Sequence, residues 1–311
     1  MDAWLIVIRA AHFAATALTA GVLAFLVVVA QPALRGAASL EAACALRCRQ
    51  LAWLALAATL LSGLAWVAVE IMAMTERSLS DAMQDGLVSI VLTRTTFGLV
   101  ADLRLGLALL LAAALAFASA TAASRAIALG SAAALLASLA WSGHAAGTVG
   151  PKGPLHLAAD AMHLLAAGAW IGGLVPLALV LANARHDGQW AAVAAKIVRR
   201  FSVMGMVSVA TLVATGAVNA WFLVGSWRAL TGTSYGRLLL VKLGLFAALL
   251  ALAAVNRLHL TPRLVSPAPA QAQALHLLVR SCIMEIALGV LVFGVVGALG
   301  TLHPAIHLVP P

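Results

Sequence analysis

Charged residues are scarce in this sequence: Asp, Glu, Lys and Arg make up 9% of the 311 residues, whereas hydrophobic residues make up 64%. An ordinary soluble domain carries roughly 25% charged residues, so this scarcity excludes the soluble globular class. Apolar runs of about 20 residues are long enough to cross a bilayer as helices. The composition therefore predicts an all-α, polytopic (multi-pass) membrane protein surrounded by lipid.

Several other features are missing. The three cysteines cannot form a disulfide framework, and they include no C-x-x-C redox motif. The chain has no P-loop, and no polar segment is long enough to form a nucleotide-hydrolysing domain. The net charge of +9 comes mainly from Lys and Arg in short connections between apolar runs, as membrane topology requires. We therefore expect neither an enzyme nor a nucleic-acid-binding protein.

Eight apolar segments are long enough to span the membrane. They lie near residues 4–32, 49–72, 97–120, 125–143, 156–182, 201–224, 236–258 and 277–301. Most Lys and Arg residues fall between segments one and two, three and four, five and six, and seven and eight. By the positive-inside rule these connections are cytoplasmic, which predicts that both termini are periplasmic.

An internal repeat divides the eight segments into two groups of four. Residues 92–107, LTRTTFGLVADLRLGL, align without a gap on residues 230–245, LTGTSYGRLLLVKLGL. His12 in the first segment and His163 in the fifth also hold matching positions. Because four helices separate the copies, they share an orientation, which predicts two parallel repeats. The predicted repeats cover residues 1–146 and 147–311.

Histidines gather at one side of the predicted bundle. The predicted topology puts six of the nine on or a few turns below the periplasmic surface. An ionisable side chain inside apolar sequence is costly enough to indicate function, although a single such histidine is as often a packing residue. Imidazole binds copper, zinc, nickel and haem iron. The predicted metal ligands are His12, His144, His156, His163, His303 and His307.

One predicted helix carries three of these polar groups on a single face. His156, Asp160 and His163 fall within roughly 60° of one another, and Trp170 lies on the same stripe. The two histidines are about 10 Å apart along the axis, so one ion cannot easily bind both. We expect one histidine to be a ligand and Asp160 to fix its tautomer from the outer shell.

Further charges lie inside the predicted spans, including Arg9, Lys242 and Glu285. Arg9 and Asp160 each precede a histidine by three residues at similar depth, so they are a candidate ion pair. We assign these residues a supporting role. A structural ion pair and a proton relay remain alternatives for them.

Sulfur-containing residues gather near the predicted cytoplasmic side. Thiolates and thioethers select Cu(I), so these residues could form an exit site. The alternative is that they are small or flexible apolar residues that fill the core. The residues are Cys44, Cys48, Cys282, Met204 and Met206.

The chain resembles the CopD/PcoD family of copper-resistance membrane proteins. The resemblance rests on G-H-A at 143–145, DAMHLLAAGAWIGGL at 160–174, Tyr235-Gly236, Lys242-Leu243, Asn256-Arg257, Pro262-Arg263, Arg280, Glu285 and the proline-containing tail. It implies an inner-membrane protein that moves copper from periplasm to cytoplasm, often beside a periplasmic copper-binding partner of the CopC type.

Two functions of different classes are consistent with these observations. The first is copper transport, as Cu(I) or Cu(II), through the periplasmic histidines. The second is a haem-binding or quinone-linked redox protein, in which His12 and His163 are the two axial ligands of a b-type haem. A copper sensor or scaffold that binds without transport is a third possibility. The sequence does not determine the oligomeric state.

Overall fold

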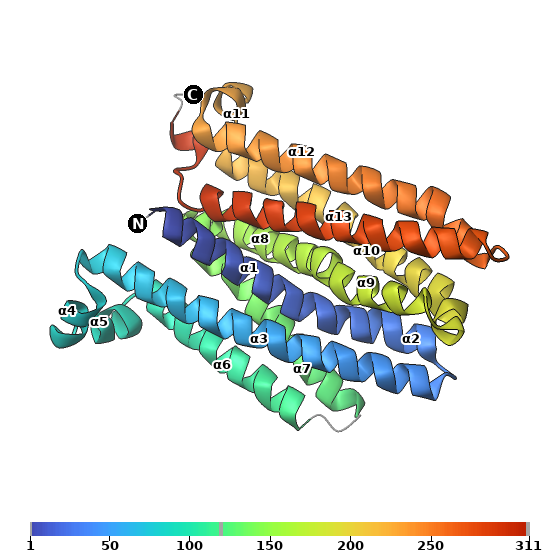
Figure 1. Cartoon of the computed structure of the whole chain (residues 1–311). Coiled ribbons are helices and arrows are strands. Elements are labelled where there is room, and N and C mark those ends of the chain that lie inside the picture. The colour runs from blue at the N-terminus through green and yellow to red at the C-terminus, as the bar shows by residue number, and fades with distance from the viewer. Residues whose placement is uncertain (1, 118–120, 309–311) are drawn as a thin grey trace.

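The computed structural model describes residues 2–117 and 121–308, which form a bundle of helices without any strand (Figure 1). Eight stretches in these ranges are long and apolar enough to cross a membrane, which confirms the predicted all-α, eight-span fold. In chain order they are α1 (Asp2–Ala24) with the π-helix η1 (Phe25–Ala30) and α2 (Gln31–Leu34); α3 (Ala38–Thr75); α6 (Thr96–Ala116); α7 (Ala122–Ala137) with η2 (Ser138–Ser142); α8 (Gly153–Ala167) with the π-helix η4 (Gly168–Gly172) and α9 (Gly173–Ala184); α10 (Gly188–Leu223); α12 (Ser234–Val255) with the π-helix η5 (Asn256–Leu260) and η6 (Thr261–Val265); and α13 (Ala270–Leu299). Shorter helices are α4 (Leu79–Gln84), α5 (Leu87–Arg94), η3 (His144–Gly147), α11 (Trp227–Gly232) and η7 (Ala305–His307).

Helix α1 lies at the centre of the bundle. Within its most apolar window, 72% of the residues are buried, against 6% for the stretch that begins with α12. It packs against α3, η4, α13 and α7. Small residues permit this contact, because a Cβ at Gly21 would overlap the backbone of Gly168 and Gly172. Close backbone approach is the usual way in which helices associate inside a membrane, where burial of apolar surface supplies no drive.

Two helices extend well beyond the predicted spans. Helix α3 has 38 residues and α10 has 36, whereas the sequence predicted spans at 49–72 and 201–224. The added turns carry arginines, which interrupt the apolar run on which the prediction relied. In α3, Cys44 is buried against the core while Arg47 is exposed, so the extra turns are amphipathic and pack on one side only.

The aligned segments 92–107 and 230–245 have the same local structure. Thr95 and Thr233 each end a short helix and cap the next, accepting hydrogen bonds from the backbone nitrogens of Gly98 (3.0 Å) and Gly236 (2.9 Å). At both glycines a Cβ would overlap the carbonyl oxygens of the preceding short helix. The relation between the complete four-helix repeats, 1–146 and 147–311, stays a prediction.

The N-terminal start of α1 and the end of α13 lie at the same end of the bundle, together with α4, α5 and α11 (Figure 1). We call this the termini end. The positive-inside rule predicts that it is periplasmic. Alkaline phosphatase folds only outside the cytoplasm, so a fusion at exposed Gly150 is expected to be active and one at exposed His186 inactive. Enzyme assays of the two fusions in intact cells check this, and the reverse pattern would invert every orientation given below.

Candidate functional site

His144 is held at the termini end by a backbone hydrogen bond. It follows η2 in the turn η3, and its Nε2 lies 3.1 Å from the carbonyl oxygen of Leu299 at the end of α13. Because a carbonyl only accepts hydrogen bonds, Nε2 carries the proton and Nδ1 keeps a free lone pair. Burial lowers the pKa of His144, and the charges of Arg9, His303 and His307 add to this, against the opposing Leu299 bond. The neutral imidazole is the form that binds metal.

The other histidines of this end have different surroundings. His303 and His307 are exposed on the segment after α13, close enough to His144 for their charges to interact. His156 is only 1% exposed; its Nδ1 lies 2.7 Å from Thr148 Oγ1, and its ring stacks on Phe222 with centroids 4.5 Å apart. His156 is therefore packed and hydrogen-bonded, while the tail histidines are open to solvent.

Asp160 is the centre of a polar group between α8, α10 and α12. Its Oδ1 accepts a hydrogen bond of 3.1 Å from Asn219 on α10, and its charge interacts with Lys242 and Tyr235 on α12. His163, one turn further along α8, has its Nδ1 3.0 Å from Thr215 Oγ1 on α10. Asn219 and Thr215 are polar residues inside an apolar span, which is the signal in the sequence that could have identified them. A single Thr or Asn in a span is a weak signal.

Two sequence-based pairings are wrong. Asp160 was expected to fix the tautomer of His156 or His163, but those rings bond to Thr148 and Thr215. The proposed pair of Arg9 with Asp160 does not form either. The Arg9 guanidinium donates to the Ser142 carbonyl at 3.5 Å, and its charge interacts with Glu70 rather than with Asp160. Matching depth in two helices does not say which way the side chains point, and here they point to different neighbours.

The interior of the N-terminal four helices is rich in positive charge. Arg9 and Arg104, each 8% exposed, lie over the Trp66 ring at 4.8 and 5.3 Å from its centroid. Trp66 Nε1 donates to Glu70 at 3.2 Å. Arg104 makes its hydrogen bonds to neutral groups: the Ser138 hydroxyl and carbonyl and the Ser142 hydroxyl. Glu70 thus interacts with Arg9, whereas Arg104 has only neutral hydrogen-bond partners among those described. Sequence reasoning missed Trp66, although it is one of eight tryptophans.

His12 lies beside this cationic group. Its Nδ1 is 3.2 Å from the Thr59 carbonyl and 3.1 Å from Ser62 Oγ, both on α3. Its Nε2 is buried without a hydrogen-bond partner among the described residues. His12 therefore turns toward α3, whereas His163 turns toward α10. The haem alternative, which needs both rings to face one macrocycle, stays a prediction that an absorbance spectrum of the purified protein can decide.

A cavity of about 270 Å³ opens among α9, α10, α12 and α13, on the side away from the termini end. Trp170 lies at its border, and Cys282, Met206 and Glu285 line it. Glu285, 2% exposed, accepts hydrogen bonds from Asn256 Nδ2 at 2.6 Å and from Ser281 Oγ at 3.5 Å. The cavity is otherwise mostly apolar, but Arg257 also lines it and donates a hydrogen bond of 2.6 Å to Ser202 Oγ.

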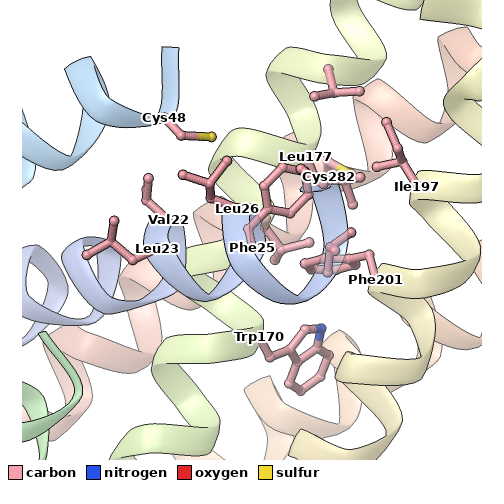
Figure 2. Close-up of a cluster of buried hydrophobic side chains, with 14 of the residues drawn as sticks. Val22, Leu23, Phe25, Leu26, Cys48, Trp170, Leu177, Ile197, Phe201 and Cys282 are labelled. Atoms are coloured by element: carbon pink, nitrogen blue, oxygen red, sulfur yellow. The ribbon is translucent and has the colours of Figure 1, made fainter. Parts of the chain in front are cut away.

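The five predicted exit residues do not form one site. Cys282 and Met206 line the large cavity, and Met204 packs beside the core near Gly173. Cys44 and Cys48 line a separate, much smaller cavity between α3, α9 and α10. Figure 2 shows Cys48 on α3 and Cys282 on α13 within the same apolar cluster, each surrounded by hydrophobic side chains.

The six predicted histidine ligands are likewise divided among separate positions. Within residues 2–117 and 121–308, no three His, Cys, Asp or Glu side chains lie close enough together to hold one ion. His144 interacts electrostatically with the two tail histidines, His303 and His307. A copper ion would have to draw in His303 and His307 from the exposed segment.

Comparison with known proteins gives a consistent result. A family model described as "Copper resistance protein D" matches residues 195–299, and one described as "Copper resistance protein D-like, N-terminal domain" matches residues 1–154. Copper resistance protein D of Pseudomonas syringae pv. tomato is 38% identical over 174 residues, which cover 54% of this chain and 56% of that protein. Inner membrane protein YebZ of Escherichia coli (strain K12) is 33% identical over 166 residues, 53% of this chain and 55% of that protein.

A third relative is Copper transport protein CutJ of Bacillus subtilis (strain 168), which is 35% identical over 122 residues, 39% of this chain and 22% of that protein. The alignments thus span about half the length of the first two relatives, and less of the third. No solved structure matches the chain.

Proposed function

The chain belongs to the copper resistance protein D family and is a multi-pass inner-membrane protein, and from this premise we propose that it binds copper and carries it across that membrane. Copper is the cargo, and it enters at the termini end and leaves on the cytoplasmic side. The protein acts by binding and transfer rather than by catalysis. A periplasmic CopC-like protein is the partner that we propose for delivery to the exposed tail histidines.

The observation that carries this proposal is a series of polar groups along the C-terminal four helices. The His144 ring meets the edge of Tyr235 with centroids 5.8 Å apart, and Tyr235 interacts with Asp160. Lys242 interacts with both Asp160 and His163. From the termini end inward, each of these side chains therefore contacts the next one or interacts with it electrostatically, although the surrounding helices are apolar.

Below His163 the series is interrupted by an aromatic contact and then resumes. Trp170 meets Phe246 edge to face with centroids 6.2 Å apart, and it borders the cavity that contains Cys282 and Glu285. We assign Trp170 and Phe246 the role of a barrier between the upper polar groups and the cavity. A cation that passes this barrier reaches a carboxyl and a thiol, which are suitable copper ligands.

The sign of the buried charge favours the same route. The interior of the N-terminal four helices has Arg9 and Arg104 against Glu70, whereas the series described here has Asp160 and Glu285 against Lys242. Charges inside a membrane interact over longer distances than in water, because the surroundings are less polarisable. A copper cation is therefore repelled from the first region and accepted in the second.

Asp160→Asn tests this route. The substitution keeps the size of the side chain but leaves Lys242 without its counter-charge, so a copper ion meets net positive charge. Copper accumulation in cells that express the variant is expected to fall by about 10-fold or more, because a unit charge a few ångströms away contributes more than the roughly 1.4 kcal/mol that corresponds to a tenfold change. The measurement is cellular copper per amount of membrane-inserted protein.

Asp102→Asn is the matched control. Asp102 also lies inside a predicted span, but on the exposed side of α6. It should accumulate copper as the unaltered protein does. Normal accumulation with Asp160→Asn, at equal protein level, would exclude the route through α8, α10 and α12.

A further inference from the structure

Cys44 and Cys48 form a pair that the proposed route does not use. Both lie in the first third of α3, on the side of the bundle opposite the termini end, and each is 2% exposed. They line a cavity of about 10 Å³ together with Arg47, Asn183 and Trp190. That volume is about one water-sized sphere, so the site has room for a single small ion and little else.

The spacing of the pair suits a bridging ion better than a disulfide. Residues i and i+4 of a helix have Cβ atoms about 5–6 Å apart, whereas a disulfide needs about 3.5–4.5 Å. A bond between Cys44 and Cys48 would therefore distort α3. Their side chains already interact directly with each other, so both sulfur atoms point to the same small space.

The charge next to the pair fits a bound anionic complex. When two thiols bind Cu(I), each loses a proton, copper keeps its oxidation state, and the resulting two-thiolate complex carries one negative charge. Arg47 interacts electrostatically with Cys44, and its guanidinium lies 6.0 Å from the Trp190 ring centroid. It can therefore offset that charge without leaving its place.

We propose that Cys44 and Cys48 bind one Cu(I) ion between their sulfur atoms, on the side of the bundle opposite the termini end. Thiolates prefer soft ions, Cu(I) and zinc among them. Structural zinc usually has four protein ligands, and the part of the chain that the structure describes brings no third His, Cys, Asp or Glu side chain to the pair, whereas two thiolates suffice for Cu(I). The inference depends on the proposed function only for the identity of the metal.

The test measures Cu(I) bound by the purified full-length chain in detergent, in competition with a Cu(I)-selective chelator. The Cys44→Ser/Cys48→Ser variant is expected to bind one Cu(I) fewer per chain than the unaltered protein. X-ray absorption of the unaltered protein, loaded with one Cu(I), is expected to show two sulfur neighbours. Ala55→Ser is the matched control, because Ala55 is also 2% exposed on α3 but lines neither of the two cavities described above, and it should retain the full number of ions.

Three results would overturn the proposal: an unchanged copper count in the double variant, an absorption spectrum without sulfur neighbours, or an equal loss with Ala55→Ser. If the double variant does not fold, as judged by its elution and thermal unfolding without copper, the spectrum of the unaltered protein decides alone. Failure of the transport route would be recognised separately, since Asp160→Asn would then accumulate copper normally while the Cu(I) count still depended on the cysteine pair.

Discussion

Replacing Gly172 with alanine is expected to destabilise the protein strongly. A Cβ at Gly172 would overlap the carbonyl oxygen of Ala17 and lie 3.1 Å from the Cα of Gly21. Both neighbours are backbone atoms of the central helix α1, so no side chain can rotate away. Overpacking typically costs 1–3 kcal/mol, and we expect about 3 kcal/mol or more here because two helices must separate.

Thermal unfolding in detergent, followed by circular dichroism, measures this effect. Gly106→Ala is the control, since a Cβ at Gly106 on α6 would meet no atom within 4 Å. It should leave the free energy of unfolding unchanged or raise it by up to about 1 kcal/mol, because alanine favours the helix. Equal behaviour of the two variants would show that α1 and η4 are not in contact.

Trp66→Ala is expected to have an effect at least as large. Trp66 is 2% exposed, and the guanidinium groups of Arg9 and Arg104 lie 4.8 and 5.3 Å from its ring centroid. Removing a buried aromatic side chain costs about 3–5 kcal/mol from the cavity alone. The two arginines would also lose cation–π contacts that are worth about 2 kcal/mol each when desolvated, although these energies do not simply add.

Trp221→Ala provides the comparison, because Trp221 is 74% exposed on α10. The melting temperature of purified Trp66→Ala should fall strongly, whereas that of Trp221→Ala should stay close to the original. Trp66→Phe should lie between them, since it keeps a ring but cannot donate to Glu70. A melting temperature for Trp66→Ala equal to that of Trp221→Ala would contradict the stacked arrangement.

The sequence predicted the fold well because each span is a long apolar run, and such runs are constrained mainly by bilayer thickness. It placed the ends of α3 and α10 poorly. In these terminal turns one side is covered by another helix and the other is exposed, as the buried Cys44 and the exposed Arg47 show in α3. Which side is covered depends on how the helices pack, and the sequence alone does not show it.

The candidate site was predicted in part. Asp160 and Lys242 were singled out because a charge inside apolar sequence is conspicuous, and the structure brings the two near each other. Asn219 and Thr215 were missed, since neutral polar residues in a span are common enough to be overlooked. The direction of each imidazole, toward Thr215 for His163 and toward α3 for His12, depends on helix rotation, which sequence spacing alone does not supply.

The π-helical segments η1, η4 and η5 have a consequence for how these spans can change in evolution. A π turn closes its hydrogen bonds over one more residue than an α turn, so it contains the equivalent of a single-residue insertion without a break in the helix. Deleting one residue from η4 would leave α8 and α9 continuous but change their phase by about 100°. The turns that carry Asp160 and those that line the cavity would then face different directions. While the extra residue of η4 is retained, α8 and α9 each keep the rotation that suits their own neighbours. Substitutions on one helix therefore do not change the direction in which the side chains of the other point.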